Sequence, residues 1–177
     1  MPEFYEESVM HKFGLKRKIK SLRTDVESFV PMFHNWIQED RIPNHIMVDV
    51  VDYKHIPDGP GIMLIAHEGH FSLDFEDNEL GLLYMRKTQL GDNVPETLSA
   101  IQQILDFAVE LIKIDSAIGE KIEFSDGYQL ISNDRYEFSN NLDSEKKLLV
   151  VASGVFSDAV LSVPETLKGS RLKINIQ

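Results

Sequence analysis

Three apolar runs separated by short turn-forming breaks, within residues 44–87, constrain the fold of this 177-residue chain more than any other feature. The first run, residues 46–56, is rich in β-branched side chains, and the strong turn formers of residues 57–61 separate it from the second run, residues 62–75. A third run covers residues 80–87. The pattern predicts a β-hairpin followed by a third strand, and therefore an antiparallel sheet.

The segment before these runs has the periodicity of an amphipathic helix. Within residues 24–40, Thr24 and Glu27 have the spacing of a capping box, and apolar side chains then recur every three or four residues. Pro31 cannot donate an intrahelical hydrogen bond. We therefore expect this helix either to start at Ser28, which would place Pro31 in the first turn, or to kink.

The second half of the chain contains two further helical segments. Pro95 opens one whose apolar residues share a single helical face, and it ends within residues 114–119. Residues 143–163 include a continuous apolar run, which fits a buried strand as well as a helix. The length of this segment and the capping residues Asn141 and Asp143 favour the helix.

The remaining segments complete an α+β fold. Alternating apolar residues within 121–136 predict one or two strands, and residues 171–177 predict a short final strand. The order helix, three strands, helix, two strands, helix, strand predicts an antiparallel sheet of about five to six strands with three helices packed on one face. No glycine-rich loop joins a strand to a helix, which excludes the dinucleotide fingerprint and the P-loop.

Composition favours a cytoplasmic single-domain protein without cysteine chemistry. The chain is 42% hydrophobic, which suits one core at this length, so we expect a single domain over residues 24–177. We expect a cytoplasmic protein, because no apolar run approaches the roughly 20 residues of a membrane span and the first residues lack a secretory signal. The absence of cysteine excludes disulfides, thiolate metal ligands and a thiol nucleophile.

The charge distribution is uneven. Residues 1–23 hold six of the 18 basic residues but only three of the 29 acidic ones, so the rest of the chain carries a net charge of −14. Such a body repels phosphate backbones, which argues against nucleic acid as the main partner. We expect residues 1–23 to form a solvated, flexible basic arm; an arm folded back onto the acidic body, or onto an acidic partner, is the alternative.

The most chemically suggestive cluster lies in the second apolar run. Glu68, His70 and Asp74 alternate toward one face of the predicted strand, and Asp49 and Asp52 belong to the preceding strand. These nitrogen and oxygen donors could hold a divalent metal ion such as Zn²⁺, Mn²⁺ or Fe²⁺. The spacing matches no established metal or catalytic motif, so a solvated polar face is the alternative, and we predict no catalytic residue and no cofactor.

A small-molecule pocket under the helices is a further possibility. Its candidate wall residues come from the three predicted strands, and among them an arginine could hold an anion. They are Tyr53, His67, Phe71, Tyr84 and Arg86.

The stretch VPMFHNWIQEDRIPNHIMVDVVDYKHIPDGPGIMLIAHEGHFSLD, followed by GLLYMRK and later by KIEFSDGYQLISNDRYEFSNN, resembles a family of small uncharacterised bacterial proteins. The resemblance covers about residues 29–140 and implies that the chain is helical from Asp143 onward. It implies no activity, cofactor or catalytic residue.

These observations favour a non-enzymatic binding or assembly domain, acting as a homo-oligomer or as a subunit of a complex with a protein partner. Oligomerisation would cover a sheet edge or an apolar helix face. A metal-binding protein or metal-dependent enzyme that uses the His/Glu/Asp cluster is one alternative. A protein that binds a small anionic molecule is the other.

Overall fold

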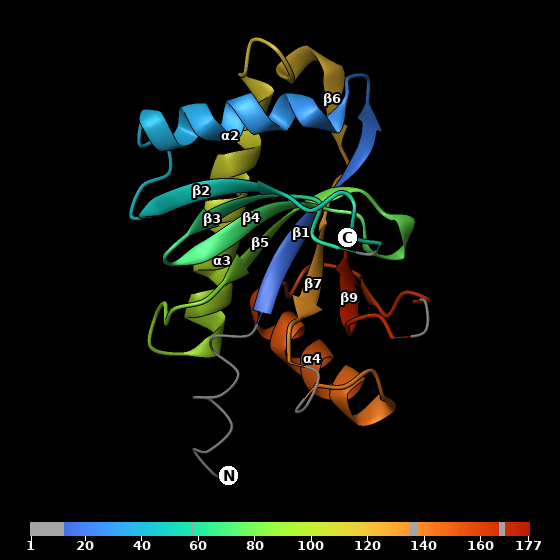
Figure 1. The fold of residues 1–177 in the computed structure, drawn as a ribbon. Helices are drawn as coiled ribbons and strands as arrows, with labels where there is room; N and C mark the ends of the chain where they lie inside the picture. The colour runs from blue at the N-terminus through green and yellow to red at the C-terminus, as the bar shows by residue number, and fades with distance from the viewer. Residues whose placement is uncertain (1–12, 58, 135–137, 167–168) are drawn as a thin grey trace.

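The computed structural model describes residues 13–57, 59–134, 138–166 and 169–177. Over these residues the chain forms three α-helices and a nine-stranded, open, antiparallel sheet (Figure 1). The α+β class predicted from the sequence is therefore confirmed. The expected number of five to six strands is too small, and the predicted order, which begins with a helix, does not match because a strand comes first.

The strands are β1 (Phe13–Leu22), β2 (Met47–Asp52), β3 (Ile62–Ala66), β4 (Gly69–Asp74), β5 (Gly81–Arg86), β6 (Ile122–Phe124), β7 (Tyr128–Ser132), β8 (Leu161–Ser162) and β9 (Lys173–Ile176). The α-helices are α2 (Phe29–Gln38), α3 (Val94–Lys113) and α4 (Leu142–Val155). Short 3₁₀ segments are η2 (Val26–Ser28), η3 (Glu76–Asn78) and η4 (Gly119–Lys121). The sheet order is β2-β3-β4-β5-β1-β7-β9-β8, and β6 pairs with β1.

Strand β1 lies in the middle of the sheet, between β5 and β7 (Figure 1). Its Leu15 is buried in the main apolar core, and Lys16, which points to the opposite face, is buried as well. The expectation of a solvated arm is therefore wrong for residues 13–22, because this segment is a central strand whose basic side chains meet acidic groups of the folded body. Residues 1–12 lie outside the described part of the chain.

The second apolar run, residues 62–75, forms two strands rather than one. Strands β3 and β4 pair directly, with Ile65 opposite His70, so that His67 and Glu68 form the turn between them. Gly69, which follows the turn, packs too closely for a side chain, since a Cβ there would lie 2.7 Å from the Tyr84 hydroxyl oxygen. The turn thus brings β4 back beside β5 and Tyr84.

The helices follow most of their sequence signals. The predicted capping box of Thr24 and Glu27 is wrong, because neither η2 nor α2 has a side-chain cap hydrogen bond and Glu27 pairs with Lys54. Helix α2 begins at Phe29 and has Pro31 in its first turn, which confirms the late start. The Asn93 side chain caps α3 by accepting a hydrogen bond from the Glu96 backbone N–H, at 2.9 Å. Residues 143–163 are helical only as far as Val155, so the helix prediction is confirmed and its length is overestimated.

One apolar cluster joins the sheet to the helices. It contains side chains from α2, α3 and α4 together with alternate residues of the central strands, such as Leu15, Leu73 and Leu82. A smaller cluster of Leu83, Met85 and Ile131 lies on the opposite sheet face. Within the described ranges, no helix is long and apolar enough to cross a membrane.

Candidate functional site

A chain of three buried polar side chains lies where the end of β5 meets the segment between α2 and β2. Tyr84 is fully buried, and His45 and Arg86 are 6% and 7% exposed. The Tyr84 hydroxyl oxygen lies 2.7 Å from Nε2 of His45 and 3.1 Å from Nη1 of Arg86. Tyr84 and Arg86 are two residues apart on β5 and therefore point to the same face, toward the helices.

The hydrogen bonds define the proton positions in this chain. Nδ1 of His45 lies 2.8 Å from the carbonyl oxygen of Pro43, which can only accept, so Nδ1 carries the proton. Nε2 of neutral His45 then accepts from the Tyr84 hydroxyl, whose oxygen accepts from Arg86. Burial lowers the pKa of His45, the nearby Arg86 charge lowers it further, and burial raises the pKa of Tyr84. Both rings are therefore uncharged at neutral pH.

Arg86 supplies the charge at this site. Its Nε donates to the Thr88 carbonyl oxygen at 2.9 Å, and its Nη1 donates to Tyr84. Both acceptors are neutral. No carboxylate of the described residues lies within the 4.0 Å ion-pair distance of the guanidinium. Buried charges are normally paired, and Arg86 has no carboxylate in direct contact among the described residues. The Glu68 carboxylate, which accepts from the Ile46 backbone N–H, acts on His45 and Tyr84 through space and makes no ion pair with Arg86.

Arg86 and His45 line a cavity of about 370 Å³ beside α3. Its apolar wall consists of Ile42, Pro43, Leu90, Ala100, Ile104 and Phe107. The remaining lining residues are Asn44 and Gln103, which are exposed. A mostly apolar hollow of about 300–1,000 Å³ with a few convergent polar groups is the usual form of a small-molecule site.

The structure brings together three of the five residues predicted for a ligand pocket. The rings of Phe71 and Tyr84 lie 4.6 Å apart, and Arg86 contacts Tyr84. Tyr53 lies instead at the far end of the β2–β3 hairpin, where its backbone N–H donates to the Gly61 carbonyl. The side chain of His67 is exposed in the β3–β4 turn. Sequence reasoning missed His45, because its partner Tyr84 follows 39 residues later and no local pattern connects them.

The five residues predicted as metal ligands do not converge. Glu68 accepts a hydrogen bond from the Ile46 backbone N–H at 2.7 Å, whereas Asp74 lies at the other end of β4. Asp49 and Asp52 are exposed on β2. His70 lines a different cavity from His45. In the chain as described, no group of three or more His, Asp or Glu side chains is arranged to hold a metal ion.

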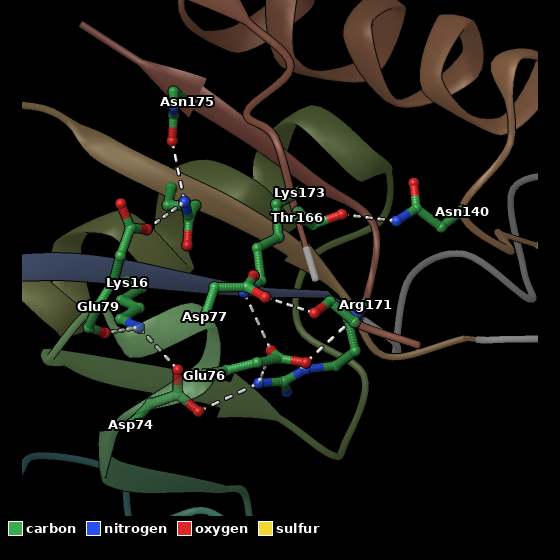
Figure 2. A network of polar contacts seen from close by, with 12 residues as sticks. Lys16, Asp74, Glu76, Asp77, Glu79, Asn140, Thr166, Arg171, Lys173 and Asn175 are labelled. Carbon is green, nitrogen blue, oxygen red and sulfur yellow. Dashed lines mark hydrogen bonds and ion pairs between the residues drawn. The ribbon is translucent and has the colours of Figure 1, made fainter. Parts of the chain in front are cut away.

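Asp74 belongs to a buried network of charges on the sheet face opposite the helices (Figure 2). Its carboxylate lies between Nζ of Lys16, at 2.7 Å, and Nη2 of Arg171, at 3.2 Å. Gly81 leaves room for this contact, because a Cβ there would lie 2.6 Å from Cε of Lys16. Arg171 also pairs with Glu76, at 2.8 Å.

The described part of the network is balanced in charge. Its described members are four cations, Lys16, Lys18, Arg171 and Lys173, and four carboxylates, Asp74, Glu76, Asp77 and Glu79. A second cavity, of about 290 Å³, lies beside it and includes His70 and Ser72. Burial lowers the pKa of His70. Because the charges here neutralise one another, the network is suited to holding the strands together, whereas the Arg86 cavity has a charge to offer a ligand.

Comparison with protein-family models, with curated proteins and with solved structures gave no match to this chain.

Proposed function

We propose that this protein binds a small anionic molecule in the Arg86 cavity, defined as the hollow lined by Arg86, His45 and the apolar wall beside α3. The observation that carries the proposal is the buried Arg86 guanidinium, which contacts only neutral acceptors among the described residues. An unpaired buried charge is costly, because the water it loses is not replaced by an opposite charge. A bound anion would supply that charge.

The polar chain behind Arg86 supports a binding role. Tyr84 uses its hydroxyl proton on His45, and His45 uses its own proton on Pro43, so neither ring has a proton free for transfer in this arrangement. Their positions are set by buried hydrogen bonds. They therefore act as a fixed support that holds the Arg86 guanidinium at the cavity wall.

The test compares anion binding by the wild type and by Arg86→Met, which keeps an unbranched side chain and removes the charge. We expect phenylacetate, phenyl phosphate or benzenesulfonate to raise the melting temperature of the wild type, since a ligand that binds only the folded state stabilises it. Charge-assisted hydrogen bonds contribute about 1.5–3 kcal/mol, so Arg86→Met should lower the affinity roughly 10- to 100-fold.

Arg23→Met is the matched control, because Arg23 is an exposed arginine whose guanidinium donates to the Glu120 carbonyl oxygen, away from the cavity. It should bind anions like the wild type. Equal anion binding by wild type and Arg86→Met would refute the proposal, as would the absence of any stabilising anion.

A second candidate function, assembly as a homo-oligomer, is supported by the outer strand β2. This strand lies at one edge of the described sheet, where Val48 is 63% exposed and Ile46, just before the strand, is 66% exposed. Exposed edge strands with apolar side chains readily pair with another chain. The molar mass in solution, measured by light scattering over a range of concentrations, tests this candidate, and a monomer throughout would remove it.

A further inference from the structure

The Arg86 cavity has a buried end and an exposed end. Arg86, His45 and Ile42 form the buried end, since each is less than a tenth exposed. Phe107 is 42% exposed and lies on the α3 side, with the exposed Gln103 one helical turn before it. A ligand that pairs with Arg86 therefore places its anionic group deep in the cavity and the rest of its body toward Phe107.

The donors left on Arg86 are sufficient to hold a carboxylate. An arginine has five N–H donors, and two of those of Arg86 are used by Thr88 and Tyr84. The remaining donors are on the two terminal nitrogens, whose fork can hold a carboxylate through two parallel hydrogen bonds. This geometry needs no further donor from the protein.

The charge of the cavity also limits the ligand. Arg86 is the only cationic side chain among the described lining residues, and His45 is neutral. A dianion, such as a phosphate monoester at neutral pH, would bring a second negative charge into a buried site without a second cation. A single negative charge matches the cavity.

The wall around the rest of the ligand is apolar. Leu90, Ile104 and Phe107 line the cavity and are more exposed than the residues of its buried end. Burial of apolar surface against them stabilises an apolar body, whereas the hydroxyl groups of a sugar acid would lose water without finding partners there. The ligand body is thus an alkyl or aryl group.

We propose that the ligand class is a monocarboxylic acid with an apolar body, bound with its carboxylate on Arg86 and its body against Ile104 and Phe107. This inference rests on the proposed function and adds the chemical class of the ligand. In this proposal Arg86 binds the negative charge of the ligand, and Phe107 selects ligands whose body is apolar.

Isothermal titration at pH 7.5 with four probes tests the class. Phenylacetate is the expected ligand, phenyl phosphate carries the same ring on a dianion, phenylacetamide is its neutral analogue, and gluconate is a monocarboxylate with a polar body. We expect the last three to bind roughly tenfold or more weakly than phenylacetate, because each lacks a matched charge or an apolar body.

Two variants, tested with phenylacetate and acetate, distinguish binding of the apolar body from binding of the carboxylate. Phe107→Ser should weaken phenylacetate several-fold and leave the weaker binding of acetate unchanged, since acetate bound at the buried end does not reach Phe107. Ile114→Ser is the matched control, because Ile114 is an exposed apolar residue just after α3 that does not line the cavity. It should bind both acids like the wild type.

The outcomes distinguish this inference from the proposed function. Arg86-dependent binding of phenyl phosphate or gluconate that equals or exceeds binding of phenylacetate would overturn the ligand class and leave the anion site standing. Equal loss of acetate and phenylacetate in Phe107→Ser would also overturn the class. If none of the anionic probes binds in a manner that depends on Arg86, both proposals fail.

Discussion

Replacement of Asp74 by asparagine tests whether the buried charge network holds the sheet together. Asp74 is 2% exposed and contacts two cations, Lys16 at 2.7 Å and Arg171 at 3.2 Å. Asparagine has nearly the same shape, so the variant removes the charge and leaves the packing. The measured loss then reports the electrostatic contribution of this carboxylate.

The two cations that contact Asp74 keep different partners in the Asp74→Asn variant. Arg171 keeps Glu76 at 2.8 Å. Lys16 is fully buried and, among the described residues, keeps only a hydrogen bond to the Glu79 carbonyl oxygen as a direct contact. The cost therefore falls on Lys16. Removal of one partner from a buried ion pair typically costs about 3–5 kcal/mol, and because Glu79 remains near Lys16 we expect about 3 kcal/mol.

The penalty should depend on pH in a defined direction. Burial lowers the pKa of Lys16 below its ordinary 10.5, and Asp74 opposes that shift, so Asp74→Asn lowers this pKa further. The unfolded chain keeps Lys16 protonated up to about pH 10.5. Below about pH 10.5 the unfolded chain therefore binds the Lys16 proton more tightly than the folded chain does, and this difference is larger in the variant than in the wild type. The free energy of unfolding of the variant should approach that of the wild type as the pH rises from 7 toward 10.

Urea denaturation at pH 7 and pH 9.5 measures both effects. Asp158→Asn, at an exposed aspartate, is the control and should change the free energy of unfolding by no more than about 0.5 kcal/mol. If Asp74→Asn does not fold, Lys16→Met removes the other partner, and its cost should be smaller because Asp74 keeps Arg171 at 3.2 Å. A cost below about 1 kcal/mol for Asp74→Asn at pH 7 would refute this account of the network.

Two further predictions concern His45 and strand β2. Burial lowers the pKa of His45 below its ordinary 6.5, so the unfolded chain takes up a proton that the folded chain refuses, and the free energy of unfolding should fall as the pH drops below about 6.5. In urea denaturation between pH 8 and pH 5, His45→Gln should weaken the dependence of the free energy of unfolding on pH. An unchanged pH dependence would contradict the assignment of this effect to His45. If light scattering finds an oligomer, Val48→Lys should convert it to a monomer, because a charged side chain blunts an edge strand; an unchanged molar mass would place the interface elsewhere.

Local signals predicted the helices well. The late start of α2 follows from Pro31, and the start of α3 follows from Pro95 together with the Asn93 cap. The division of residues 62–75 into β3 and β4 was harder to predict, because a two-residue turn at His67 and Glu68 contains no glycine or proline to mark it. The sequence predicts that residues 62–75 are extended, but it does not predict the turn that divides them into two strands.

The candidate site could be predicted only in part, because its contacts connect distant segments. Tyr84 and Arg86 are two residues apart on one strand, so their shared face follows from the period of a strand. The contact between His45 and Tyr84 spans 39 residues, and that between Asp74 and Arg171 spans 97. Such pairs depend on the sheet topology, which charge and periodicity alone leave open.

The basic residues of β1 show how a charge pattern can be misread. Lys16, Lys18 and Lys20 occupy alternate positions, and each pairs with a carboxylate elsewhere in the chain, at Asp74, Glu79 and Glu123. A solvated arm has no reason to keep a period of two, whereas a strand beside carboxylates of neighbouring segments does. The same strand places Leu15 opposite Tyr84 on the helix-facing side. One strand thus carries the charge network on one face and packs beside Tyr84 of the Arg86 site on the other.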